Sequence, residues 1–213
     1  AISIKPDYAE AFYNMGNALQ SRSKFKQAIK AYSKALSVKP NYTNAYNNMG
    51  NALQATGKMD DAIECYEKVL HFRPNYAEAF INKGVALNEL GKHERAIEAY
   101  KNAISINPEY AEAYYNKGVT LRDLGKRQEA LGAYYKAVSL NVDYAEAYNN
   151  IGVVLKELGK PDEAIAAYNK ALSIRPEYAE AHQNLSFLLL NIGKLEQGLN
   201  EYEWRWKTLK NST

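Results

Sequence analysis

A repeat of 34 residues runs through the chain and constrains its fold more than any other feature. Tyrosine recurs at this spacing without interruption, at Tyr8, Tyr42, Tyr76, Tyr110, Tyr144 and Tyr178. Asparagine does the same, at Asn14, Asn48, Asn82, Asn116, Asn150 and Asn184. A fixed period of this length is typical of stacked arrays, in which each unit buries its apolar face against its neighbours. We therefore expect the 213 residues to form one elongated array rather than one or two globular domains.

Each repeat is predicted to contain two helices, as the third repeat illustrates. The first helix is expected over residues 76–90, with Asn75 as its N-cap. Gly91 is expected to end it, because glycine adopts the left-handed conformation at low cost. The second helix is expected over residues 94–106, since Pro108 cannot continue a helix.

Small residues recur where two helices must approach closely. On the first helix of each repeat these are Gly16, Gly50, Gly84, Gly118 and Gly152, and on the second they are Ala28, Ala62, Ala96, Ala130 and Ala164. Glycine inside a helix costs about 1 kcal/mol relative to alanine, so its recurrence indicates a packing requirement. Tyrosines on the second helix are expected to fill the spaces between: Tyr32, Tyr66, Tyr100, Tyr134, Tyr168 and Tyr202. Ser23 replaces the turn glycine of the first repeat, where we expect a looser turn.

The order and spacing of these positions resemble the tetratricopeptide repeat. The resemblance covers repeats at 9–42, 43–76, 77–110, 111–144 and 145–178, a divergent repeat or capping segment at 179–213, and the end of a preceding repeat at 1–8. It implies an all-α, right-handed superhelical solenoid of about six helix-turn-helix repeats, acting in protein–protein interaction. Because the chain opens in mid-repeat without Met, we expect it to be a piece of a longer protein.

Composition argues against several functional classes. The net charge of +3, from 27 basic and 24 acidic residues, argues against nucleic acid or a membrane surface as the partner. No apolar run approaches the roughly 20 residues of a membrane helix. Cys65 stands where other repeats have alanine, so we interpret it as a buried filler in a reducing, cytoplasmic setting. His71, His93 and His182 share no repeat position, and the sequence predicts no metal, no cofactor and no catalytic residue.

The six-fold asparagine row is the sharpest functional candidate. In the family that the chain resembles, the first helix of each repeat lines the concave face, so the row would form a ladder along a groove. A carboxamide can bond the N–H and C=O of an extended peptide as a pair. The predicted peptide-binding residues are Asn14, Asn48, Asn82, Asn116, Asn150, Asn184, Val85, Val119, Val153 and Tyr115. The alternative is that the asparagines bond only the neighbouring repeat. Similar ladders hold substrate peptides in O-linked N-acetylglucosamine transferases, whose repeat region this array resembles.

One kind of peptide site is excluded by the residues present. Repeats that clamp a C-terminal carboxylate carry lysine and arginine at three of five fixed positions. The corresponding positions here hold Tyr13, Asn17, Asn48, Glu78 and Asn82, so every cation is missing and Glu78 would repel the ligand.

The last repeat departs from the pattern. Ser186 replaces the helix glycine and Gly198 replaces the helix alanine. The segment containing Trp204, Arg205 and Trp206 is predicted to cap the array, or alternatively to dock against another domain or chain. Two further functions stay open: the substrate-selecting region of a larger glycosyltransferase-like enzyme, and a scaffold that self-associates through its repeat ends.

Overall fold

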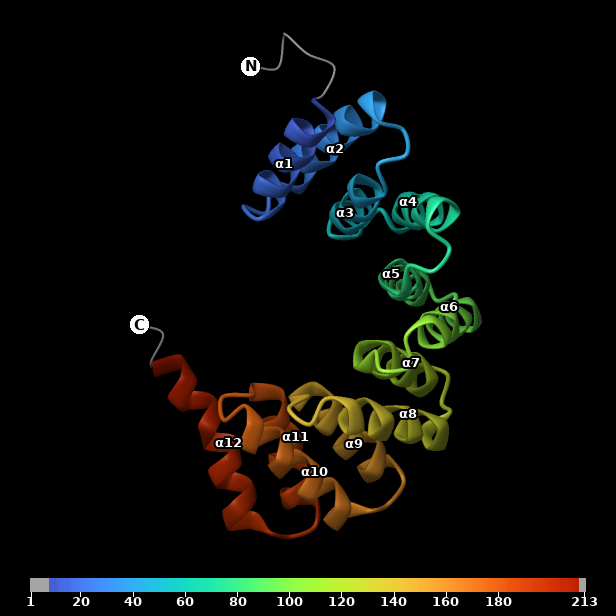
Figure 1. The fold of residues 1–213 in the computed structure, drawn as a ribbon. Helices are drawn as coiled ribbons and strands as arrows, with labels where there is room; N and C mark the ends of the chain where they lie inside the picture. Colours follow the sequence, from blue (N-terminus) through green and yellow to red (C-terminus); the bar gives the residue numbers. More distant parts are fainter. Residues whose placement is uncertain (1–7, 211–213) are drawn as a thin grey trace. The chain divides into compact units, whose positions relative to one another are not determined.

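The computed structural model describes the main chain over residues 8–210 and the side chains over residues 8–204 (Figure 1). Within this range the chain forms twelve α-helices and no strand. The helices are α1 (Ala9–Gln20), α2 (Phe25–Val38), α3 (Thr43–Gln54), α4 (Met59–Phe72), α5 (Ala77–Glu89), α6 (His93–Ile106), α7 (Ala111–Asp123), α8 (Arg127–Leu140), α9 (Ala145–Glu157), α10 (Pro161–Ile174), α11 (Ala179–Asn191) and α12 (Leu195–Lys210). Each 34-residue period therefore holds one helix pair, and the all-α prediction is confirmed.

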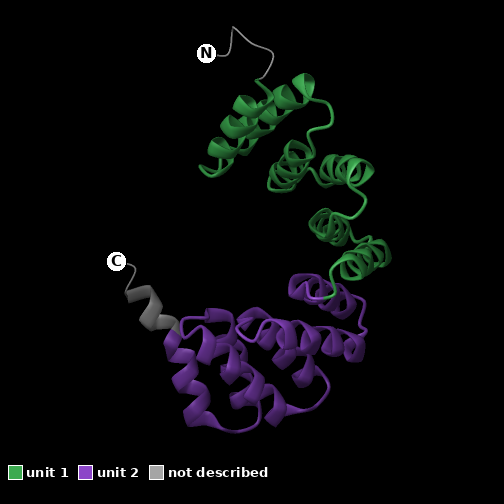
Figure 2. Cartoon of the chain, in the orientation of Figure 1, with its two compact units in different colours: residues 1–108 green, residues 109–213 purple. Residues whose placement is uncertain are grey.

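The helix pairs divide into two compact units (Figure 2). Unit 1 covers residues 1–108 and contains α1 to α6, and unit 2 covers residues 109–213 and contains α7 to α12. In both units each odd-numbered helix packs against the even-numbered helix that follows it. The proposed end of a preceding repeat, residues 1–8, falls outside the described chain except for Tyr8.

The turns inside the helix pairs share one left-handed residue. Gly57 has a φ of 77° and Gly91 a φ of 69°, as predicted for a turn glycine. Ser23 adopts the same conformation with a φ of 56°, and the Lys24 N–H still bonds the Leu19 carbonyl at 2.9 Å, as in the glycine turns. The expectation of a looser turn was therefore wrong, because serine takes on the backbone strain and keeps the hydrogen bonds.

The predicted N-cap of the third repeat was wrong by one residue. Tyr76, not Asn75, occupies the cap position of α5, and it forms no side-chain cap bond. The helix starts without side-chain capping, so its stability comes mainly from packing against α4 and α6.

The core of each of the first five helix pairs is a tyrosine ring laid against a glycine. Tyr66 and Tyr134 are fully buried on α4 and α8. A β-carbon placed on Gly50 would lie 2.6 Å from the ring of Tyr66, and one placed on Gly118 would lie 2.6 Å from the ring of Tyr134. Carbon atoms do not approach this closely, so the ring can occupy its site only because the helix residue opposite is glycine.

Candidate partner-binding face

The odd-numbered helices form one continuous face in each unit. In unit 1, α3 contacts both α1 and α5, and in unit 2, α9 contacts both α7 and α11. We call the solvent-facing sides of these helices the A face of their unit. Asn14, Asn48 and Asn82 lie on the odd-numbered helices of unit 1, and Asn116, Asn150 and Asn184 on those of unit 2, where Asn150 is buried.

In unit 1 the asparagines bond the preceding repeat. The Nδ2 of Asn48 donates to Tyr13 Oη at 3.2 Å and to Asn17 Oδ1 at 2.8 Å. The Nδ2 of Asn82 donates to Asn47 Oδ1 at 3.3 Å. Asn14 is exposed. Part of the row therefore links neighbouring repeats, which is the alternative interpretation drawn from the sequence.

Unit 2 repeats this linkage with one exception. Asn150 donates to Tyr115 Oη at 3.2 Å, and Asn184 donates to Asn149 Oδ1 at 3.0 Å. The half-buried side chain of Asn116 forms no hydrogen bond within the described part of unit 2. The carboxamide of Asn116 is therefore not bonded to the preceding repeat, unlike those of Asn150 and Asn184.

The hydrogen-bonding capacity left in the row follows from these contacts. A carboxamide has two N–H donors and an oxygen acceptor. Both N–H groups of Asn48 are in use, whereas Asn184 uses one of its two and keeps its oxygen free within the described chain. The oxygen of Asn150 accepts from Arg122 at 3.3 Å, so one N–H remains. Within unit 2, the groups available to a ligand are therefore richest at Asn116 and Asn184.

The apolar candidates do not share one environment. Val85, Val119 and Val153 are half-buried on α5, α7 and α9. The ring of Tyr115 packs against those of Tyr134 and Tyr144, with centroids 5.9 and 4.8 Å away. Burial is the main cause that raises the pKa of Tyr115. Tyr115 is therefore held inside the repeat packing, while the valines are partly open to solvent.

Other asparagines on the odd-numbered helices accept hydrogen bonds from the buried tyrosine hydroxyls, a structural role that the sequence analysis did not predict. Tyr32 donates to Asn17 at 2.9 Å, and burial raises the pKa of Tyr32 to about 12. Tyr66 donates in the same way to Asn51 at 2.7 Å. The signal was in the sequence, because each asparagine stands 15 residues before its tyrosine.

The glutamates at the start of the A-face helices are engaged by their neighbours. Arg175 donates to Glu146, and this bond lowers the pKa of Glu146 against the opposing effect of its burial. Glu180 accepts from Asn149 at 3.0 Å. In unit 1, Glu78 accepts from Asn47 at 3.0 Å. Glu78 and Glu180 therefore take part in contacts between repeats, whereas the charge of Glu146 is compensated by Arg175 of its own repeat.

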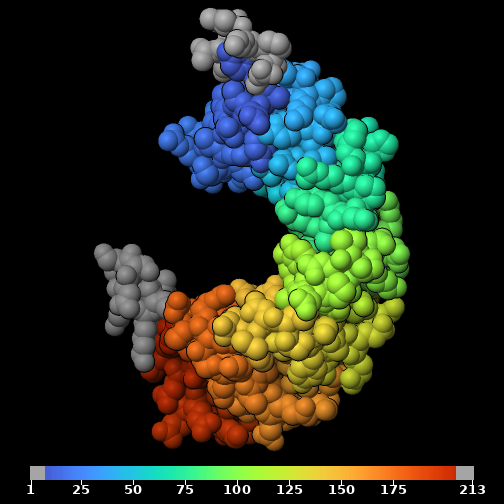
Figure 3. Space-filling model, viewed as in Figure 1, coloured from blue at the N-terminus to red at the C-terminus, as the bar shows by residue number. Residues whose placement is uncertain are grey.

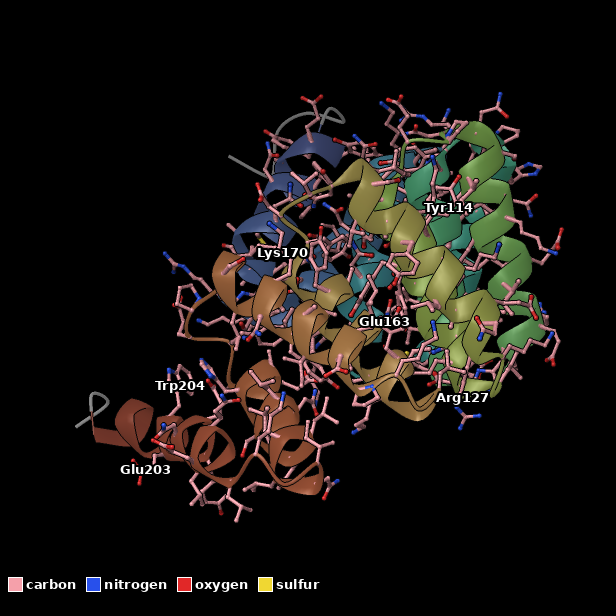
Figure 4. The ribbon with its side chains drawn as sticks, turned by 90° about the horizontal axis from the view of Figure 1, so that it is seen from below. Tyr114, Arg127, Glu163, Lys170, Glu203 and Trp204 are labelled. Atoms are coloured by element: carbon pink, nitrogen blue, oxygen red, sulfur yellow. The ribbon has the colours of Figure 1, made fainter. Side chains whose placement is uncertain are left out.

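The C-terminal helix pair uses different contacts from the others. Ser186, which stands in place of the glycine, donates to the carbonyl oxygen of Gly198 at 2.8 Å. The ring of His182 stacks on Trp204 with centroids 3.9 Å apart, and its Nδ1 lies 2.5 Å from Glu201 Oε2. Trp204 is labelled on α12 in Figure 4. The side chains of the other proposed docking residues, Arg205 and Trp206, lie outside the described residues.

The remaining candidate chemistry is structural. Cys65 is buried, and this burial raises the pKa of its thiol to about 12. Such a thiol is a poor nucleophile near neutral pH. Among the described residues, no group of three His, Cys, Asp or Glu side chains is placed to hold a metal ion. None of the described helices is both long and apolar enough to cross a membrane.

Family models match most of the chain. Models described as tetratricopeptide repeat match residues 43–76 and 145–178, and also 65–98 and 167–200. A further model, described as TPR repeat, matches residues 16–57, 84–121 and 118–159. The chain belongs to the tetratricopeptide repeat family. No curated protein sequence matches it.

Solved structures similar to the tetratricopeptide array agree with this assignment. The crystal structure of MamA is 32% identical, with a TM-score of 0.69 over 78% of this chain and 96% of MamA. YrrB, described as a TPR protein with an unusual peptide-binding site, is 25% identical, with a TM-score of 0.63 over 80% of this chain and 88% of YrrB. The pilF protein of Pseudomonas aeruginosa is 20% identical, with a TM-score of 0.82 over 98% of this chain and 95% of pilF, and its likeness shows the fold alone.

Proposed function

We propose that this tetratricopeptide array is a non-catalytic interaction scaffold that binds an extended segment of a partner protein on the A face of unit 2. Asn116 carries the proposal, because its half-buried carboxamide is unused by the described neighbours in its unit. An acceptor and two donors at such a position match the C=O and N–H groups of an extended peptide. Asn184 offers an oxygen and one N–H two repeats further on.

The energies favour a peptide with apolar side chains. A hydrogen bond contributes about 0.5–1.5 kcal/mol net, whereas ordering a peptide residue costs about 1–2 kcal/mol. Hydrogen bonds to the asparagines alone would therefore not hold a peptide. Val119 and Val153 lie three residues after Asn116 and Asn150, on the same side of their helices, and provide the apolar contacts that the balance requires. Val85 stands in the same relation to Asn82 on α5.

A peptide-binding relative supports the same class of ligand. YrrB, which matches over 80% of this chain, is described as having a peptide-binding site. We take from YrrB only the ligand class, since the residues proposed here come from the contacts of this chain.

The test begins with a peptide selected from a random library for binding to the whole chain. Asn116→Ala and Asn184→Ala should each weaken that peptide by roughly 2- to 10-fold in calorimetry, the effect of one lost hydrogen bond. Asn169→Ala, on the exposed side of α10, is the control and should bind like the wild type. If the selected peptide binds both A-face variants as tightly as the control, the proposed function is wrong.

A further inference from the structure

The charges of this chain are not spread evenly along it. Between Glu10 and Asp60 there is no acidic residue, so all 24 acidic residues lie outside this stretch. The same stretch carries seven cations: Arg22, Lys24, Lys26, Lys30, Lys34, Lys39 and Lys58. A net charge of +3 for the whole chain conceals a strongly basic first helix pair.

Most of these cations lie on α2 or beside its ends, whereas Lys58 precedes α4 and pairs with Asp61 at 3.8 Å. Lys26, Lys30 and Lys34 follow one another at intervals of four residues, which places them along one side of the helix. All three are exposed, and no acid among the described residues pairs with them. The first turn of α2 contains no acidic residue, although that of α4 contains Asp60 and Asp61. The positive charge of this helix is therefore uncompensated.

Two surface cavities border the lysine row. One of about 320 Å³ lies between α1 and α2 and is lined by Met15, Leu19, Gln27, Lys30, Ala31 and Lys34. Another of about 360 Å³ lies at the start of α2 and is lined by Ser23, Lys24, Phe25, Lys26, Gln27 and Thr56. We call the first of these the basic furrow. The surface of this first helix pair is drawn in blue in Figure 3.

The lining of the basic furrow combines apolar and cationic side chains. Met15, which is 42% exposed, lines it together with Leu19 and Ala31. Lys30 and Lys34 line the same cavity. A ligand that fills the furrow must therefore offer apolar side chains flanked by negative charge.

The corresponding cavity of the third repeat shows that the charge is specific to the first. That cavity measures about 170 Å³ and is lined in part by Lys83, Arg95 and Glu98. Lys83 pairs with Glu67 at 2.8 Å, and Glu98 stands where the first repeat has Lys30. Both repeats therefore have a cavity at this position. In the first repeat its lysines have no acidic partner, whereas in the third Lys83 is paired with Glu67 and Glu98 adds a negative charge.

We propose that the basic furrow binds an acidic amphipathic segment of a partner protein, separately from the A face. Glutamate or aspartate side chains at successive turns of such a segment pair with Lys26, Lys30 and Lys34, and its apolar side chains enter the furrow over Met15 and Leu19. The apolar side chains that line the furrow favour a protein segment over nucleic acid, whose phosphates would leave them uncovered. The exposed side of α2 presents mainly lysine, serine and glutamine, with Val38 at its end as the exposed large apolar side chain, and this composition disfavours insertion into a membrane.

The test uses a helical peptide of about 18 residues, with glutamates at every fourth position and leucines beside them. We expect it to bind the whole chain, and to lose affinity between low salt and about 0.3 M salt because exposed charges are screened. The Lys26→Asp, Lys30→Glu double variant should bind it roughly tenfold more weakly. Asp60 and Glu64 occupy the same positions in α4, so the repeat fold accommodates these residues.

The control makes the same change in net charge elsewhere on the chain. The control is the double variant Lys136→Glu, Lys170→Glu, which alters exposed lysines on α8 and α10 of unit 2. Lys170 is labelled in Figure 4. This variant should bind the peptide with unchanged affinity. Equal binding of a peptide with glutamine for glutamate would overturn the proposal. The proposal would also be overturned if a short duplex DNA or phosphatidylserine vesicles bound through Lys26 and Lys30 while the acidic peptide did not bind there. Because Asn116→Ala does not touch α2, a failure of the A-face proposal leaves this result unaffected.

Discussion

Two buried tyrosines, Tyr66 of unit 1 and Tyr134 of unit 2, have the same packing and different polar surroundings. In unit 1, Tyr66 on α4 lies against Gly50 and donates its hydroxyl to Asn51. In unit 2, Tyr134 on α8 lies against Gly118, but its buried hydroxyl has no hydrogen-bond partner in the described structure. Valine occupies the position 15 residues before Tyr134, where Tyr66 has asparagine. The ring therefore fixes the helix pair whether or not its hydroxyl is bonded.

The replacement of asparagine by valine changes the surface of the helix as well as the core. Tyr168 repeats the situation of Tyr134, with Val153 in place of an asparagine and an unpaired hydroxyl. An unsatisfied buried hydroxyl costs about 1–3 kcal/mol. The same valines that withhold the hydrogen bond supply the apolar part of the A face of unit 2. We infer that unit 2 gives up internal hydrogen bonds at the positions where the proposed peptide needs apolar contact.

The largest effect is expected from filling the space beside the ring, which both units share. Gly50→Val and Gly118→Val should each destabilise their unit by about 1–3 kcal/mol, because the added carbon atoms collide with the tyrosine. Urea unfolding followed by circular dichroism measures this. Gly132→Ala is the control: no atom lies within 4 Å of its added carbon, so alanine should stabilise α8 by about 0.5–1 kcal/mol. A much smaller cost at Gly118 than at Gly50 would show that the two units do not share the same packing.

Removing the tyrosine hydroxyl should have different effects on stability at Tyr66 and at Tyr134. Tyr66→Phe leaves Asn51 and Gln54 without the donor that now lies 2.7 and 3.2 Å away, and should cost about 1–2 kcal/mol. Tyr134→Phe removes an unpaired polar group, so the protein should be unchanged or up to about 1 kcal/mol more stable. The same denaturation experiment compares the two variants. Equal losses would mean that the Tyr134 hydroxyl is bonded in solution.

The smallest effect is expected from giving unit 2 the polar residue of unit 1. Val119→Asn should add a hydrogen bond from Tyr134 worth about 0.5–1.5 kcal/mol, offset in part by lost apolar contact. The net change should lie within about 1 kcal/mol of the wild type. A double-mutant cycle with Tyr134→Phe isolates the bond, because the gain should vanish in the phenylalanine background. A gain that persists there would contradict the hydrogen bond.

The sequence predicted the helix pairs closely because their determinants are local and repeated. The third repeat illustrates this: its helices were expected over 76–90 and 94–106, and they span Ala77–Glu89 and His93–Ile106. Glycine, proline and the 34-residue period mark these boundaries wherever they occur. Ser23 was misjudged because the conformation of a turn also depends on the hydrogen bonds that its neighbours impose.

The candidate site was less accessible to sequence reasoning. A row of asparagines indicates a shared position, but the bond partner of each depends on side chains about 31 or 35 residues away. Tyr13, Asn47, Tyr115 and Asn149 provide those partners, and they vary between repeats. The basic furrow was missed for a different reason, since a total charge averages over the chain and hides a local excess.

The short reach of these contacts also bears on how the protein is made. The hydrogen bonds described between side chains of neighbouring repeats link residues no more than 35 positions apart. Helical proteins with such local contacts fold in microseconds to milliseconds, whereas a ribosome adding about 5–20 residues per second needs roughly 2–7 s for the next repeat. Each helix pair therefore has time to close on the one before it during synthesis, and the growing chain exposes little more than one unfinished repeat to aggregation.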